Sequence, residues 1–126
     1  MAQATVLIVD DNAGIRRLLR RAVAEISATV WECADGDEAL SAYEAHWPDV
    51  VLMDIRMRRV EGLQATRSIC GAHPQACIFI VTDYDDEALR QAAKNAGACG
   101  YVNKQNLTGL ARAVADALQL PGIEYR

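Results

Sequence analysis

The sequence has no apolar run long enough to cross a bilayer, and its first residues lack the basic and long apolar stretches of a secretory signal. Basic residues are also in the minority, because 13 Lys and Arg are set against 17 Asp and Glu, for a net charge of −4. Nucleic-acid binding relies on Lys and Arg that neutralise phosphates, so we expect no direct nucleic-acid contact by this domain. We predict a cytoplasmic protein without membrane contact, in which any DNA role needs another domain.

The cysteines also lack the spacing of a metal or disulfide framework. There are four of them, Cys33, Cys70, Cys77 and Cys99, with no C-x-x-C pair. The two histidines lie in turn-like segments and not at ligand spacing. The pattern favours reduced, mostly buried thiols over a zinc site or a disulfide.

The composition is that of one globular domain. The chain has 126 residues, of which 52% are hydrophobic and 24% charged, enough to bury a core without disulfides or metals. We predict a single domain over residues 1–120. Residues 121–126 are predicted to be a C-terminal tail or the start of an interdomain linker, because Pro121-Gly122 and a few polar residues follow Leu120.

Short apolar runs alternate with segments of helical periodicity. Strands are predicted at 6–9, 29–33, 50–54, 78–82 and 100–104, and helices at 12–26, 37–45, 61–70, 85–96 and 106–120. Asn12 and Asn106 are predicted to cap the first and last helices. The first helix has an apolar stripe made of Ile15, Leu18, Leu19, Ala22, Val23 and Ile26. This alternation predicts an α/β fold, (βα)5, with a doubly wound five-stranded parallel sheet.

Polar residues follow four of the predicted strands at the point where each ends. Asp10-Asp11 follow the first strand, Asp54 ends the third, Thr82 ends the fourth and Lys104 ends the fifth. Because parallel strands end at the same edge of a sheet, we expect these side chains to form one charged pocket beside the first strand.

The residue types of this pocket suit phosphoryl transfer. Clustered carboxylates with vacant coordination positions suit hydrated Mg²⁺, and a carboxylate beside such a metal is a competent nucleophile toward phosphorus. Lys104 can pair with one phosphoryl oxygen and the Thr82 hydroxyl can donate to another.

With these motifs in order, the chain resembles the receiver domain of bacterial two-component response regulators from Thr5 to Leu118. The matching features are the acidic pair Asp10-Asp11, the phosphoacceptor Asp54, the switch hydroxyl Thr82, the switch aromatic Tyr101 and the phosphate-binding Lys104. The segment 96–104 is most similar to the subgroup whose members carry a C-terminal helix-turn-helix output of LuxR type.

The resemblance implies a flavodoxin-like strand order, 2-1-3-4-5, and a switch rather than a turnover enzyme. A histidine kinase would phosphorylate Asp54, with Mg²⁺ bound by Asp11, Asp54 and the backbone carbonyl of Arg56, and by Asp10 partly through water. Thr82 and Tyr101 would then move and change the face made by the fourth helix, fifth strand and fifth helix.

The output implied by the resemblance is control of a partner through this changed face. A DNA-binding domain C-terminal to this chain and a phosphorylation-dependent homodimer are the forms we consider. The aspartyl phosphate would be hydrolysed slowly, because the bulky Arg56 and Tyr84 are predicted to shield it from water.

Two alternatives remain open. A pseudo-receiver that binds a partner without phosphorylation draws support from Asp83 beside the pocket and from Arg58, where the family usually has proline. A Mg²⁺-dependent phosphohydrolase resembling the haloacid dehalogenase superfamily would need a second Asp two residues after the first, where this chain has Arg56. A third departure is Gln105, where many members have proline after a cis peptide, and we predict a trans Lys104–Gln105 bond.

Overall fold

The computed structural model describes residues 3–57, 61–84 and 86–120 of the chain. The predictions that concern Arg58 and the segment 121–126 lie outside these residues. Within the part of the chain that is described, no helix is both long and apolar enough to cross a membrane.

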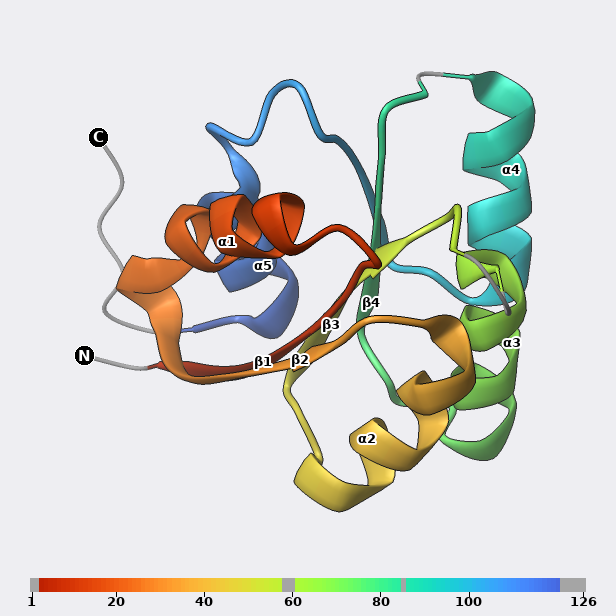
Figure 1. Cartoon of the computed structure of the whole chain (residues 1–126), viewed down its shortest axis with the longest axis horizontal. Helices are drawn as coiled ribbons and strands as arrows, with labels where there is room; N and C mark the ends of the chain where they lie inside the picture. Colours follow the sequence, from red (N-terminus) through yellow and green to blue (C-terminus); the bar gives the residue numbers. More distant parts are fainter. Residues whose placement is uncertain (1–2, 58–60, 85, 121–126) are drawn as a thin grey trace.

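Five parallel strands form one sheet in the order β2-β1-β3-β4-β5 (Figure 1). The strands are β1 (Ala4–Val9), β2 (Ser27–Cys33), β3 (Val50–Asp54), β4 (Ile78–Thr82) and β5 (Gly100–Asn103). Every residue of β3 and β4 is buried, as expected for parallel strands that are covered on both faces. The predicted flavodoxin-like order is therefore confirmed.

Helices cover both faces of this sheet (Figure 1). They are α1 (Ala13–Ala22), α2 (Ala39–His46), α3 (Gly62–Ala72), α4 (Glu87–Ala96) and α5 (Leu110–Leu118), with 3-10 turns at Ala24–Ile26 and Gly36–Glu38. Side chains of α1 and α5 pack in one core, and side chains of α2, α3 and α4 pack in the other.

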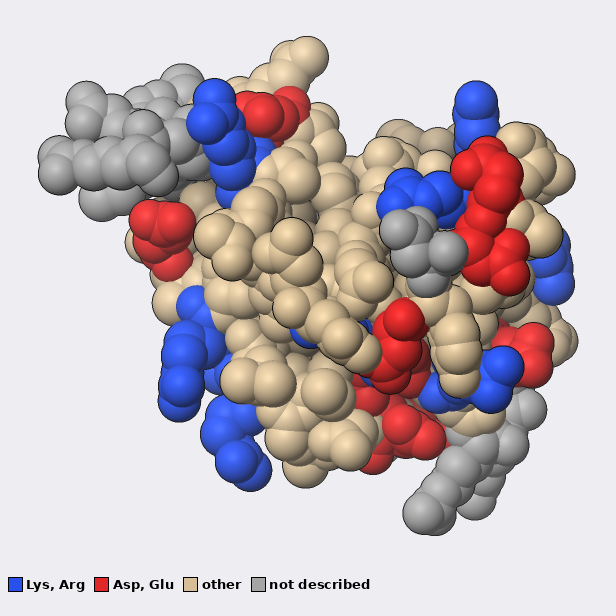
Figure 2. All heavy atoms as spheres, turned by 90° about the horizontal axis from the view of Figure 1, so that it is seen from above, with Lys and Arg blue, Asp and Glu red and all other residues tan. Residues whose placement is uncertain are grey.

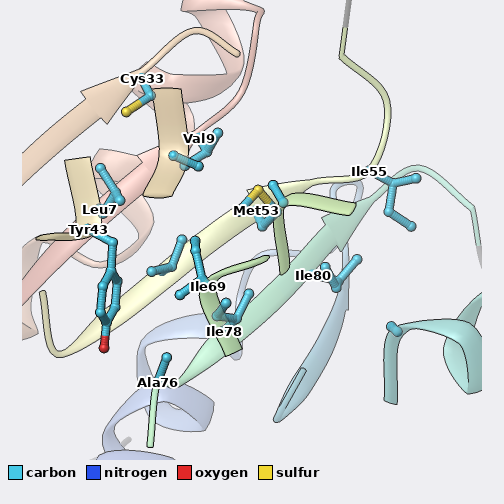
Figure 3. Close-up of a cluster of buried hydrophobic side chains, with 14 residues drawn as sticks. Leu7, Val9, Cys33, Tyr43, Met53, Ile55, Ile69, Ala76, Ile78 and Ile80 are labelled. Carbon is cyan, nitrogen blue, oxygen red and sulfur yellow. The ribbon is translucent and has the colours of Figure 1, made fainter. Parts of the chain in front are cut away.

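Strand alternation divides the apolar residues between these two cores. In β1, Leu7 and Val9 belong to the core with α2, α3 and α4, whereas Val6 and Ile8 belong to the core with α1 and α5. Figure 3 shows the first core, where Leu7 and Val9 lie with Ile69 of α3 and side chains of β3 and β4. Because the sheet is packed from both sides, its strand ends form a rigid edge for a site.

One predicted helix cap is confirmed and the other is wrong. The Asn12 side chain accepts a hydrogen bond from the backbone N–H of Ile15 at 3.0 Å and caps α1. Asn106 does not cap α5, which begins at Leu110. Its N–H donates instead to the carbonyl of Asn103 at 3.0 Å, so the chain completes a turn after β5 before the helix starts.

The first and third helices also differ from their predicted forms. The apolar stripe predicted for the first helix includes a residue that faces solvent. Leu18 is 48% exposed, whereas Leu19 is 1% exposed. Ile26 is buried, but in the 3-10 turn after α1, where the chain turns back into β2. The third helix was predicted to end at Cys70 but continues through Gly71 to Ala72.

Candidate functional site

Three carboxylates meet at the carboxyl ends of β1 and β3. Because Val9 pairs with Met53 in adjacent strands, the residues that follow them, Asp10 and Asp54, come out side by side. Carboxylate oxygens of Asp10, Asp11 and Asp54 lie within 4.8 Å of one another. Asp10 is fully buried and Asp54 is 6% exposed, whereas Asp11 is exposed to solvent.

Lys104 supplies the opposite charge from the neighbouring strands. It lies one residue beyond β5, and its backbone N–H donates to the carbonyl of Thr82 at 2.8 Å. Its Nζ lies 2.8 Å from Asp54 Oδ1 and 3.0 Å from Asp10 Oδ2. The Thr82 side chain is buried at the end of β4. The strand ends thus bring together the residues that the sequence predicts there.

The charges in this site are unbalanced. Burial raises the pKa of Asp54, and the nearby Asp10 and Asp11 raise it further, while the hydrogen bond from Lys104 works in the opposite direction. Burial alone would lower the pKa of Lys104, but its pairing with Asp54 and Asp10 raises it overall. Among the residues that the structure describes, the carboxylates of Asp10, Asp11 and Asp54 meet the single ammonium group of Lys104, and this cluster therefore favours a further cation.

The oxygen atoms present fit a hard cation. Asp10 Oδ1 accepts a hydrogen bond from the N–H of Asn12 at 2.9 Å. Asp10 Oδ2 is buried and, among the residues described, has the Lys104 ammonium as an ionic neighbour but no well-oriented hydrogen-bond donor. Three carboxylates with oxygen atoms within 4.8 Å of one another are a donor set that suits Mg²⁺.

The comparisons with known proteins agree with this geometry. A family model of the response regulator receiver domain matches residues 6–115. The chain belongs to this family.

The relatives include response regulators and DNA-binding transcriptional regulators. The response regulator GacA of Pseudomonas viridiflava is 36% identical over 111 residues, which cover 86% of this chain and 51% of GacA. The chain thus spans about half the length of that relative.

Two solved structures show the same fold. A LuxR-family two-component response regulator from Aurantimonas sp. SI85-9A1 superposes with a TM-score of 0.88 and 34% identity, covering 94% of this chain and 86% of that one. The CheX–CheY–BeF3–Mg²⁺ complex from Borrelia burgdorferi contains a chain with a TM-score of 0.83 and 25% identity, covering 90% of this chain and 87% of that one.

Two cation–π pairs lie near Thr82 and in β5. The Arg56 guanidinium lies 4.6 Å from the centroid of the Tyr84 ring. The Tyr84 N–H donates to Thr82 Oγ1 at 3.3 Å, and the Tyr101 hydroxyl donates to the Tyr84 carbonyl. The Arg90 guanidinium lies 4.7 Å from the centroid of the Tyr101 ring. These contacts connect Tyr101 of β5 to the Thr82 hydroxyl through one residue.

The structure describes two of the positions at which this sequence differs from the usual receiver pattern, Gln105 and Asp83. The Lys104–Gln105 bond is trans, as predicted, since no peptide bond within the described residues is cis. Asp83 is exposed, so its carboxylate is solvated at the rim of the pocket. The backbone carbonyl of Arg56 remains a predicted metal ligand.

Sequence reasoning missed Arg16, whose side chain binds the backbone of the acidic pair. Arg16 Nη1 donates to the Asp10 carbonyl at 2.7 Å. Its Nε also pairs with Glu32 of β2 at 2.8 Å. The hydrogen bond from Arg20, with help from Arg16, lowers the pKa of Glu32. No local sequence pattern shows which arginine of a helix reaches a strand end.

Gly62 was also missed, although it contacts the predicted acceptor directly. Its N–H donates to the Ile55 carbonyl at 2.7 Å. A Cβ atom at this position would lie 1.8 Å from the Asp54 carbonyl oxygen, so only glycine lets α3 approach the end of β3 this closely. A glycine at the start of a predicted helix, where a capping side chain is the usual choice, was the available signal.

Proposed function

We propose that this receiver domain is a phosphorylation-dependent signalling switch in which Asp54 accepts a phosphoryl group from a histidine kinase. The observation that carries the proposal is the position of Lys104 Nζ, 2.8 Å from Asp54 Oδ1 within a cluster of carboxylates. A half-buried ammonium at this point can neutralise an added phosphoryl oxygen.

The transfer requires little chemistry from the protein beyond positioning and charge. An Asp54 oxygen attacks phosphorus, the bond from phosphorus to the donor histidine nitrogen breaks, and the electron pair leaves with the imidazole. Lys104 holds one phosphoryl oxygen, and the Thr82 hydroxyl turns to donate to another. Asp54 ends as an acyl phosphate, so the domain is a stoichiometric acceptor and not a turnover enzyme.

Mg²⁺ is the cofactor in this proposal. Asp11, Asp54 and the backbone carbonyl of Arg56 would hold it, with Asp10 acting partly through water. The bound ion supplies charge neutralisation for the phosphoryl oxygens and the carboxylates. The Borrelia complex, which holds BeF3 and Mg²⁺, supports this assignment.

The output surface is proposed to be the face made by α4, β5 and α5. The hydrogen bond from Tyr101 to Tyr84, next to Thr82, gives a physical path from the phosphorylated site to this face. Tyr101 would turn inward as Thr82 moves toward the phosphoryl group, and the changed surface would control a partner. A phosphorylation-dependent homodimer on this surface is part of the proposal.

A DNA-binding domain C-terminal to this chain is the output that we favour. The LuxR-family neighbour and the partial coverage of GacA support it. The domain itself is proposed to span residues 1–120, to leave DNA contact to that output, and to work in the cytoplasm beside its kinase. In Figure 2, Lys and Arg side chains are scattered among Asp and Glu on the face in view, which is unlike a phosphate-binding surface.

Neither alternative gains support from the site. The phosphohydrolase reading needs an acid two residues after Asp54, but Arg56 stands there and packs on Tyr84. The pseudo-receiver reading relied on Asp83 opposing an added negative charge, and the exposure of Asp83 lets solvent and salt screen that repulsion.

Phosphorylation of the purified domain tests the proposal. Incubation with acetyl phosphate and millimolar Mg²⁺ should add one phosphoryl group per chain by intact mass, and a chelator should prevent the addition. Asp11→Ala should require a much higher Mg²⁺ concentration, because it removes one metal ligand while Asp54 and Lys104 remain. A domain that stays unlabelled at every Mg²⁺ concentration, while folded by circular dichroism, would favour the pseudo-receiver.

The lifetime of the phosphorylated state tests the shield over the pocket. Arg56 and Tyr84 contact each other through a cation–π interaction that is worth about 0.5–1 kcal/mol at exposed sites. We expect an Arg56→Asn, Tyr84→Ala double variant to lose its phosphoryl group several-fold faster, because water then reaches phosphorus more easily. First-order decay after donor removal measures this, and equal decay rates in variant and wild type would show that there is no shield.

A further inference from the structure

Two cysteines meet at the edge of the sheet opposite the phosphorylation site. Cys77 directly precedes β4 and Cys99 directly precedes β5, and these strands pair in register with Phe79 beside Gly100. The Cys99 N–H donates to the carbonyl of Ile78 at 2.9 Å, which fixes the start of β5 against β4. The two cysteines therefore come together although 22 positions separate them in the sequence.

Their sulfur atoms are in direct contact. The Sγ atoms of Cys77 and Cys99 are 2.7 Å apart, so small side-chain rotations would bring them to the covalent distance of about 2.05 Å. Cys70 is the next neighbour, and its Sγ contacts the Gly97 carbonyl at 3.6 Å. Cys33 is buried at the end of β2, on the opposite edge of the sheet.

The two thiols differ in a way that suits oxidation. The hydrogen bond from Cys77 lowers the pKa of Cys99 to about 7, against the effect of burial. The same interaction raises the pKa of Cys77. Burial raises the pKa of Cys33 to about 11. Cys99 is thus the more readily ionised thiol of the two, and it is also exposed.

The surroundings of Cys99 admit a small oxidant. A cavity of about 290 Å³ beside it is lined by α4 and the start of β5, including Arg90, Lys94 and Tyr101. The cavity gives a small oxidant a route to the Cys99 sulfur.

We propose that Cys77 and Cys99 are a redox modification site, at which a peroxide converts the two thiols into a reversible disulfide. The Cys99 thiolate attacks one peroxide oxygen, the O–O bond breaks, and Cys99 becomes a sulfenic acid. The hydroxide that leaves takes a proton from solvent and becomes water. Cys77 sulfur then attacks Cys99 sulfur, its proton leaves with the hydroxyl group as a second water, and the disulfide forms. The two thiols lose two electrons and hydrogen peroxide gains them.

A disulfide here would constrain the proposed output surface of α4, β5 and α5 without any contact with the acidic site. It would join the start of β5, and the turn at Gly97 that ends α4, to β4. Cytosolic disulfides in most organisms are transient and redox-sensing, which is the kind of bond expected at an exposed cysteine of low pKa. Formation of the bond needs no phosphorylation, so this inference and the proposed function can fail separately.

Peptide mapping after peroxide treatment tests the proposal. The purified domain is treated with hydrogen peroxide, alkylated under denaturing conditions and digested with trypsin, which cleaves after Arg90 and Lys94 and so separates Cys99 from Cys77. We expect two of the four cysteines to escape alkylation, a linked peptide pair that contains Cys77 and Cys99, and its loss on treatment with dithiothreitol.

Single substitutions make the assignment specific. Because Cys70 and Cys77 share one tryptic peptide, Cys70→Ser is the matched control and should retain the link, whereas Cys77→Ser should abolish it and leave Cys99 as a sulfenic or sulfinic acid. Circular dichroism checks that each variant is folded. A link that disappears in Cys70→Ser, or full alkylation of all four cysteines in peroxide-treated wild type, would overturn the proposal.

Discussion

Asp54→Asn should abolish phosphorylation of this domain by acetyl phosphate and Mg²⁺. The substitution keeps the shape of the side chain and the chance of a contact with Lys104, which lies 2.8 Å from Asp54 Oδ1 in the native site. It removes the anionic oxygen that attacks phosphorus, and a neutral amide oxygen is a poor nucleophile. Asp10 is fully buried, and Asp11 is proposed to bind the metal. Neither is therefore expected to accept the phosphoryl group in place of Asp54.

The measurement is intact mass after incubation with the donor, in wild type and variant at the same Mg²⁺ concentration. Asp116→Asn is the matched control, because Asp116 is an exposed carboxylate on α5 outside the site. It should be labelled as fully as wild type. Equal labelling of Asp54→Asn and wild type would place the phosphoryl group elsewhere and refute the assignment.

The site could be predicted from sequence because its parts lie at strand ends. Uninterrupted apolar runs predict parallel strands that are buried on both faces, and such strands all present their carboxyl ends at one edge. Once Asp54 and Lys104 are each placed at the end of a strand, the topology alone brings them together. The observed ion pair of Lys104 with Asp10 and Asp54 confirms that expectation.

Contacts between side chains of separate elements could not be predicted in the same way. The bond from Arg16 to the Asp10 carbonyl depends on how α1 is rotated on the sheet, and four arginines on one helix look alike in sequence. The approach of Cys77 to Cys99 depends on strand register. The misplaced cap at Asn106 has a more local cause, because a turn after β5 competes with helix formation for the same backbone groups.

Gly62→Ala should destabilise the domain and slow phosphorylation of Asp54, whereas Gly71→Ala in the same helix should do neither. The new methyl group at position 62 would lie 1.8 Å from the Asp54 carbonyl oxygen, so α3 or the end of β3 must shift. Overpacking of this kind costs about 1–3 kcal/mol of unfolding free energy. A Cβ at Gly71 meets no atom within 4 Å, and alanine at such a helical position adds about 0.4–1 kcal/mol by restricting the unfolded chain.

The kinetic effect follows from the same displacement. A shift of about 1 Å in a reacting group can cost roughly 100-fold in rate, and the Asp54 backbone is the atom group that must yield to the Gly62→Ala methyl. Urea unfolding gives the two stabilities, and the rate of mass gain with acetyl phosphate and Mg²⁺ gives the two reactivities. If Gly62→Ala matched Gly71→Ala in both measurements, the close approach of α3 to the acceptor would have no part in shaping the site.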